Sequence, residues 1–123
     1  MPQPEGGEDE AAVLASLIGV EQARLIDEIG DLSDELAAIA ESAAADAPDD
    51  EHDAEGSTIG YERARVQAIL EHAKRRLGEL DAVARLEPGV ARRCSSCGDA
   101  IPGERLAALP ATRICIACAK RSG

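Results

Sequence analysis

The sequence lacks the residues that fill most protein cores. Its 123 residues include no Trp and no Phe, and Tyr61 is its one aromatic residue. Because aromatic side chains supply much of the buried area of ordinary cores, a thick globular core is excluded. The apolar residues are instead Ala, Leu, Ile and Val, which suit helices that pack closely along their length. At this length the chain is one domain, or one small domain with an extension.

Long apolar runs are also missing. No segment approaches the roughly 18 to 20 apolar residues of a membrane span. The first ten residues are acidic and contain two prolines, so they do not resemble a secretory signal. We therefore expect a cytoplasmic protein that does not bind membranes, in a compartment where thiols stay reduced.

Basic residues are almost absent from the first half of the chain. Residues 1–60 contain 17 acids and one base, Arg24, whereas residues 61–123 contain 7 acids and 12 bases, so −16 and +5 give the net charge of −11. A mostly acidic chain repels the phosphates of nucleic acid, and we do not expect direct sequence-specific DNA binding. The charges either solvate exposed helix faces or, in the second half, meet an acidic surface or a nucleotide.

Heptad patterns predict two long helices. From about residue 10 to 45 and again from about 58 to 86, apolar residues recur every seven positions in two interleaved series. The first seam is Ile18, Leu25, Leu32 and Ile39 with Ala15, Gln22, Ile29, Leu36 and Ala43. The second seam is Ile59, Val66, Ala73 and Leu80 with Leu70, Leu77 and Ala84, and Arg63 occupies its remaining position.

The segment between the patterns predicts a hairpin. Pro48 and Gly56 interrupt the helical pattern in the acidic stretch 46–57, and Pro88-Gly89 stops the second helix. The predicted fold class is therefore mainly α: an antiparallel two-helix coiled-coil hairpin over residues 10–87, with an acidic tip loop. We expect a disordered acidic tail over residues 1–9 and a monomer whose seams pair within one chain. The alternative is a bundle completed by a partner chain.

Four cysteines near the C-terminus have the spacing of a metal site. Cys94 and Cys97 form one C-x2-C pair, Cys115 and Cys118 form another, and seventeen residues separate them. This falls within the range typical of four-cysteine zinc sites, and Gly98 permits the left-handed backbone that a tight turn often needs. Since the segment has few aliphatic residues, we expect metal binding to supply much of its folding energy. The sequence therefore predicts a zinc finger over residues 88–123.

Other uses of the cysteines fit less well. A dithiol redox centre needs one C-x-x-C beside a βαβ unit, a disulfide scaffold needs an exported chain, and iron–sulfur clusters usually show another spacing. Four thiolates leave zinc no open position, so we expect one structural Zn2+. We expect no enzyme, because His52 and His72 have no nucleophile arranged beside them and no phosphate-cradling glycine loop occurs.

The segment from Cys94 to Cys118 resembles the zinc finger of the DksA/TraR family. The shared pattern is C-x2-C-G-x2-I-x3-R-L-x-A-x-P-x4-C-x2-C, which includes Ile101, Arg105, Leu106, Ala108 and Pro110 besides the cysteines. The hairpin with an acidic loop also fits, so the resemblance covers about residues 10–119. The stretch DDEHDAEGSTIGYERA is similar to an actinobacterial branch of the family.

The resemblance implies a bacterial transcription regulator that binds RNA polymerase. In the family the hairpin enters the secondary channel, and two tip aspartates in the pattern D-x-x-D-x-A lie near the catalytic magnesium. Asp50 and Asp53 have this spacing, whereas Ala54 follows Asp53 directly and Glu55 stands where the family has alanine. Carboxylates are natural ligands or outer partners of Mg2+, although an Asp-rich loop is also a common solvated helix connection.

Some family members work with guanosine tetraphosphate, which basic residues on the finger and arm help to hold. Leu109 and Ala119 stand where an arginine and a lysine are common, and few residues follow Cys118, so we do not expect dependence on this nucleotide. Arg105 is also a candidate anchor of the finger. The candidates for polymerase contact are Arg75, Arg76, Arg92, Arg93, Arg105 and Arg113. The alternative function is a zinc-ribbon binding module for another protein or a nucleic acid.

Overall fold

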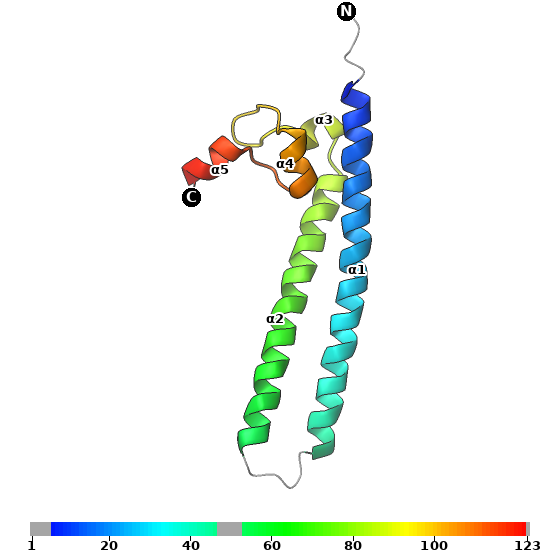
Figure 1. Cartoon of the computed structure of the whole chain (residues 1–123), viewed down its shortest axis with the longest axis vertical. Coiled ribbons are helices and arrows are strands. Elements are labelled where there is room, and N and C mark those ends of the chain that lie inside the picture. Colours follow the sequence, from blue (N-terminus) through cyan, green and yellow to red (C-terminus); the bar gives the residue numbers. More distant parts are fainter. Residues whose placement is uncertain (1–5, 47–52, 123) are drawn as a thin grey trace, which may run out of the picture. The chain divides into compact units, whose positions relative to one another are not determined.

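The structure is a computed structural model that describes residues 6–46 and 53–122, with side chains from 9 to 44 and from 58 to 122. These residues form helices and connecting loops, without a strand. The helices are α1 (Gly6–Asp46), α2 (Asp53–Ala84), α3 (Pro88–Ala91), α4 (Gly103–Ala108) and α5 (Ile116–Ser122) (Figure 1). Among the helices described, none is both long and apolar enough to cross a membrane.

Two compact units make up the chain, one over Arg24–Leu77 and one from Met1–Ala23 together with Gly78–Gly123. Both α1 and α2 contribute to each unit, and within each unit they lie side by side (Figure 1). The short helices α3, α4 and α5 all belong to the second unit. The predicted fold class, a mainly α hairpin with a C-terminal four-cysteine finger, is confirmed.

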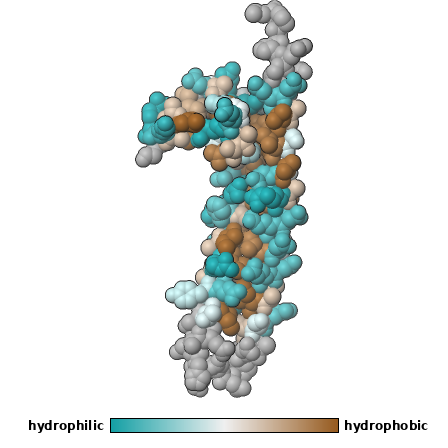
Figure 2. Space-filling view, viewed as in Figure 1, coloured by the Kyte–Doolittle hydropathy of each residue, from teal (hydrophilic) through white to brown (hydrophobic). Residues whose placement is uncertain are grey.

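The unit over Arg24–Leu77 has a narrow core along the helix seam. Leu25 of α1 and Val66 of α2 are fully buried. Leu70 and Ala73, which follow Val66 in the same predicted seam, are also buried. Figure 2 shows apolar residues along the line where the two helices meet. Other seam residues are only half-buried: Ile29, Leu32, Leu36, Ile39, Ala43, Ile59 and Leu77. The heptad series therefore identified the inward faces, but the packing is thin along much of this unit.

In the other unit the seam departs from the predicted series at both helix ends. Leu14 and Val83 are buried, whereas Ala15 and Ala84, the predicted seam residues, are exposed. An ideal α-helix drifts by about 20° per heptad relative to a strict seven-residue repeat, so the buried stripe moves to neighbouring positions. These positions also hold larger apolar side chains, which gain more from burial than alanine does.

Both long helices extend beyond their predicted bounds. Because α1 begins at Gly6, the prediction of a disordered tail was wrong for residues 6–9. Helix also occupies both ends of the predicted tip loop, since α1 ends at Asp46 and α2 begins at Asp53. Acidic residues near a helix N-terminus are favoured by the helix dipole, and both helices begin in acidic sequence. The rest of the predicted loop, residues 47–52, lies outside the described residues.

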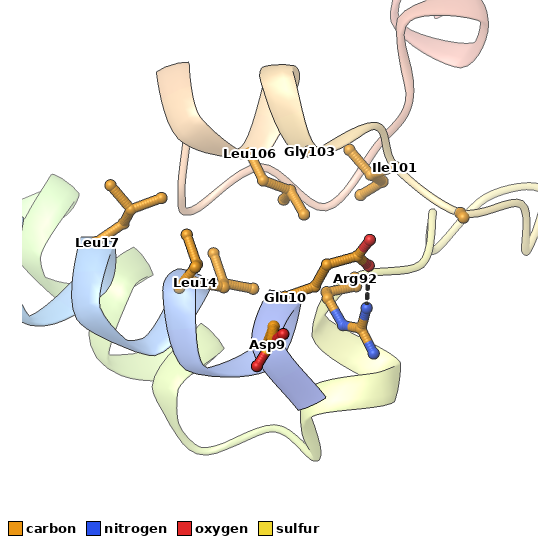
Figure 3. Close-up of a pocket in the computed structure, with 10 residues that line it drawn as sticks. Asp9, Glu10, Leu14, Leu17, Arg92, Ile101, Gly103 and Leu106 are labelled. Atoms are coloured by element: carbon orange, nitrogen blue, oxygen red, sulfur yellow. Dashed lines mark hydrogen bonds and ion pairs between the residues drawn. The ribbon is translucent and has the colours of Figure 1, made fainter. Parts of the chain in front are cut away.

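The zinc-finger segment packs on the N-terminal part of α1. Glu10 of α1 accepts a 2.6 Å hydrogen bond from Nη1 of Arg92. Leu14, Ile101 and Leu106 are buried and line one pocket of about 260 Å³; in Figure 3 the two finger residues face α1 across it. The few aliphatic residues of the finger thus share a core with α1.

Candidate metal centre

The first cysteine pair lies in a tight turn after α3. The backbone N–H of Cys94 donates to the carbonyl of Asp99 at 2.8 Å, and the N–H of Gly98 donates back to the carbonyl of Cys94 at 2.9 Å. Gly98 has a φ of 81°, a left-handed conformation that disfavours residues with a Cβ. The predicted role of Gly98 in the turn is confirmed, and the turn brings Cys94 and Cys97 to one side.

The second pair lies at the start of α5. Cys115 immediately precedes this helix and Cys118 lies in its first turn. The N–H of Ala119 donates to the carbonyl of Cys115 at 2.9 Å, and the N–H of Cys118 reaches the Cys115 sulfur at 3.5 Å. Both sulfurs of this pair lie within 4.8 Å of the sulfurs of the first pair.

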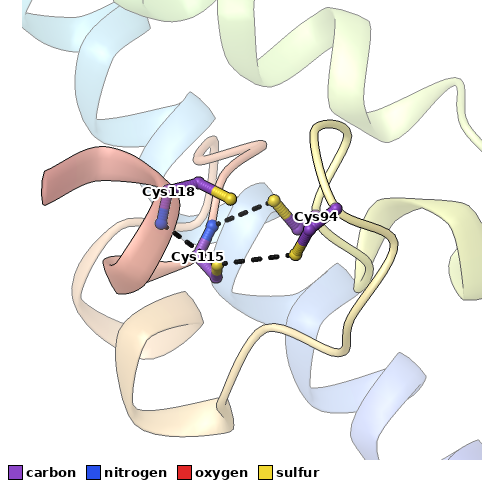
Figure 4. Close-up of side chains that lie close together, drawn as sticks. Cys94, Cys115 and Cys118 are labelled. Carbon is purple, nitrogen blue, oxygen red and sulfur yellow. Dashed lines mark hydrogen bonds between the residues drawn. The ribbon is translucent and has the colours of Figure 1, made fainter. Parts of the chain in front are cut away.

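The four cysteines are free thiols whose sulfurs all lie within 4.8 Å of one another. The Sγ atoms of Cys97 and Cys115 are 3.8 Å apart, and Figure 4 shows the side chains of Cys94, Cys115 and Cys118 close together. Tetrahedral zinc with Zn–S bonds near 2.3 Å requires sulfur separations of about 3.8 Å, so the cluster matches a zinc tetrahedron. It fits one structural zinc ion, as the spacing predicts. Cys97 is exposed and the other three ligands are buried.

The site favours thiolate at Cys94 and protonated thiol at Cys97. The backbone N–H of Cys97, followed by those of Cys115 and Ser96, lowers the pKa of Cys94 to about 6, against the effect of desolvation. The backbone N–H of Asp99 favours the Cys97 thiolate. Desolvation and the three neighbouring cysteine side chains nevertheless raise the pKa of Cys97 to about 12. Because zinc binds the thiolate form of cysteine, metal binding at neutral pH is expected to release protons from this cluster.

Hydrogen bonds from N–H groups to sulfur orient the side chains of Cys94 and Cys118. The Cys94 sulfur lies 3.4 Å from the backbone N–H groups of both Ser96 and Cys115. Nη2 of Arg121 donates to the Cys118 sulfur at 3.0 Å. The pKa of Cys118 is lowered, first by the Ser96 side chain and then by that of Cys115. Arg121 was not among the residues predicted from the sequence, where the available signal was its position three residues after a cysteine.

Two of the candidate basic residues connect parts of the finger to each other. Nη1 of Arg113 donates to the carbonyls of Val90 and Arg93, at 3.1 and 3.0 Å. Nη1 of Arg93 donates to the carbonyl of Gly98 at 3.0 Å. Arg113 thus links the segment before the second cysteine pair to the segment before the first pair.

The other candidates divide between the finger and α2. Nε of Arg105 donates to the carbonyl of Ile114 at 2.9 Å, which is the anchoring role considered from the sequence. Arg92 binds Glu10, as described above. On α2, Arg75 is exposed and Arg76 is half-buried.

The predicted tip aspartates are not part of the described site. Asp50 lies outside the described residues, and Asp53 begins α2 with a side chain that is also outside them. His72 is exposed on α2, as expected for a solvated helix face, and His52 lies outside the described residues. The structure therefore brings together the four predicted zinc ligands, and the role of the tip stays a prediction.

Comparison with known proteins supports the identification of the finger. Residues 89–122 match the family described as the prokaryotic dksA/traR C4-type zinc finger. No curated protein matches the chain. Among solved structures, the transcription factor DksA2 from Pseudomonas aeruginosa is similar, with a TM-score of 0.78 and 24% sequence identity over 98% of this chain and 90% of that chain. The likeness to DksA2 concerns the fold, and the family match confirms the resemblance inferred from the finger sequence.

Proposed function

We propose that this chain, whose residues 89–122 match the DksA/TraR C4-type zinc finger, is a transcription regulator that binds RNA polymerase through its secondary channel. The observation that carries this proposal is the combination of a long α1–α2 hairpin with a finger of this type. A solved protein with the same fold is described as a transcription factor. We propose a cytoplasmic, monomeric and non-enzymatic protein that acts by binding some polymerase states better than others.

The finger and the adjacent helix ends supply affinity in this proposal. Hydrogen bonds within the finger, the Arg92–Glu10 contact and the apolar contact with α1 belong to one compact unit. A pre-ordered unit loses less conformational entropy on binding than a flexible one. The zinc ion has no open position, so it holds the finger together and takes no part in a reaction.

The tip acids supply the effect on transcription. We propose that Asp50 and Asp53 lie near the active-site magnesium of the bound polymerase. Carboxylates suit Mg2+ as direct ligands or through its waters. This part of the proposal rests on the D-x-x-D spacing and on the family resemblance.

The test replaces Asp50 and Asp53 together with asparagine, which keeps size and removes charge. Asp31 and Asp34 provide a matched control, because they repeat the D-x-x-D spacing on exposed positions of α1. We expect D50N/D53N to bind core polymerase nearly as well as the parent, at one fixed salt concentration, yet to change transcription in vitro much less. The control D31N/D34N should match the parent in both assays.

Two other outcomes have distinct meanings. If D50N/D53N loses polymerase binding, the tip is an anchor rather than the effector. If regulation is undiminished, the loop is only a helix connection, and the displaced Ala54 marks the loss of a tip function. Binding and regulation are measured with and without guanosine tetraphosphate, and we expect no dependence on it.

The alternative is a zinc-ribbon module that binds another protein or a nucleic acid. The four finger arginines named above donate to backbone carbonyls or to Glu10, which restricts their freedom to follow a phosphate backbone. Co-sedimentation with core polymerase separates the two functions. Failure to bind polymerase, together with salt-sensitive binding to arbitrary nucleic acid, would favour the alternative.

A further inference from the structure

One charged side chain is hydrogen-bonded to a sulfur of the zinc site among the residues that the structure describes. Nη2 of Arg121 lies 3.0 Å from Sγ of Cys118. The backbone N–H contacts to the sulfurs of Cys94 and Cys115 are longer, at 3.4 to 3.5 Å. Charge-assisted hydrogen bonds are shorter and stronger than neutral ones, so this contact differs in kind from the others.

The helix α5 places this guanidinium. Cys118 and Arg121 are three residues apart within Ile116–Ser122, so their side chains lie on the same face. Ser122 Oγ, at the last residue of α5, donates to the backbone carbonyl of Cys118 at 3.0 Å. This hydrogen bond gives the Cys118 carbonyl a partner near the C-terminal end of the helix. An arginine guanidinium stays charged at every working pH, so Arg121 brings a permanent positive charge to this sulfur.

The charge of the site explains what such a contact does. One Zn2+ with four thiolates carries a net charge of −2, in a chain whose own net charge is already −11. A guanidinium at one sulfur offsets part of this charge. Partners that hydrogen-bond to metal ligands commonly change metal affinity by about 10- to 100-fold when they are removed.

We propose that Arg121 is a positioning residue of the zinc site, whose charge and hydrogen bond to Cys118 stabilise the zinc tetrathiolate and slow the loss of the metal. This role of Arg121 in metal retention does not depend on whether the protein regulates RNA polymerase.

The experiment compares R121A, R121K and K120A in the full zinc-loaded chain. Lys120 is the matched control, because it is the adjacent exposed cation of α5 and no hydrogen bond joins it to a sulfur in the described structure. Competition with a chromogenic chelator measures zinc affinity. We expect R121A to bind zinc at least about tenfold more weakly, and K120A to match the parent. R121K should recover part of the affinity, since lysine keeps the charge without the planar fork.

A second measurement separates this role from simple packing. With Co2+ in place of zinc, the sulfur-to-cobalt charge-transfer band reports the electron density on the thiolates. We expect this band to shift in R121A and to return part of the way in R121K, while helix content by circular dichroism stays the same. Equal loss of affinity in R121A and K120A would overturn the proposal, because only the overall charge would matter. Weaker affinity with an unshifted band would also overturn it, since Arg121 would then act by packing alone.

Discussion

Replacing Arg113 with alanine removes the side chain that links the two halves of the finger. Its Nη1 donates to the carbonyl of Val90 at 3.1 Å and to that of Arg93 at 3.0 Å. Its backbone carbonyl accepts two further hydrogen bonds, from the N–H of Ser95 at 2.7 Å and from the hydroxyl of Ser95 at 3.0 Å. The variant keeps the backbone contacts, so the measured effect belongs to the guanidinium.

The expected loss of stability follows from these contacts. A hydrogen bond from a charged group contributes about 1.5 to 3 kcal/mol, but one nitrogen here serves two acceptors in an exposed position. Water can replace the guanidinium at both carbonyls after truncation. We therefore expect R113A to lose about 1 to 2 kcal/mol in the free energy of unfolding. At about 4 °C per kcal/mol for a chain of this length, the melting temperature should fall by about 4 to 8 °C.

The assay is thermal unfolding by circular dichroism at a fixed concentration of free zinc, because bound metal raises the apparent stability by mass action. R75A is the control, since Arg75 is an exposed arginine on α2, and its melting temperature should stay within about 2 °C of the parent. Arg113 is also predicted from the sequence as a candidate for polymerase contact. An R113A variant that melts like the parent but binds polymerase more weakly would refute the internal role and support that contact.

Two further predictions concern the hairpin core and the metal. Leu25 is fully buried whereas Leu32 is half-buried, so L25A should cost about 2 to 5 kcal/mol and L32A clearly less, as measured by urea denaturation; equal losses would contradict the burial pattern. Zinc binding should weaken as pH falls from 8 to 6, because protons compete for the thiolates. With the pKa of Cys97 raised to about 12 and that of Cys94 lowered to about 6, each zinc should release at least one proton at pH 7.5. Titration calorimetry in buffers of different ionisation enthalpy measures that release, and a release of none would show that Cys97 is already a thiolate.

The sequence predicted those parts of the fold that depend on local pattern. The heptad series identified α1 and α2 because one apolar face must be buried against another element. The C-x2-C spacing identified the zinc site because a tetrahedral ion needs four sulfurs at fixed separations. Gly98 was recognised because a positive φ favours a residue without a Cβ.

What the sequence could not predict depends on distant partners. Arg113 contacts the carbonyl of a residue 23 positions away, and Arg92 contacts a carboxylate 82 positions away. Backbone carbonyls occur at every residue, so no sequence pattern marks the ones that accept a hydrogen bond from a given arginine. A basic residue in the finger is therefore a candidate for partner contact from the sequence alone, and only the structure shows that it also joins segments.

The contact with α1 also changes how the finger depends on zinc. Ile101 follows Cys97 by four residues and Leu106 lies in α4, between the two cysteine pairs. Both are buried, and with Leu14 of α1 they line the pocket that Figure 3 shows. A metal that fixes both cysteine pairs restricts the loop that carries these two side chains, and so holds them against α1. We therefore expect the zinc ion to stabilise the N-terminal part of α1 as well as its own ligands, although no residue of α1 belongs to the four-cysteine ligand set.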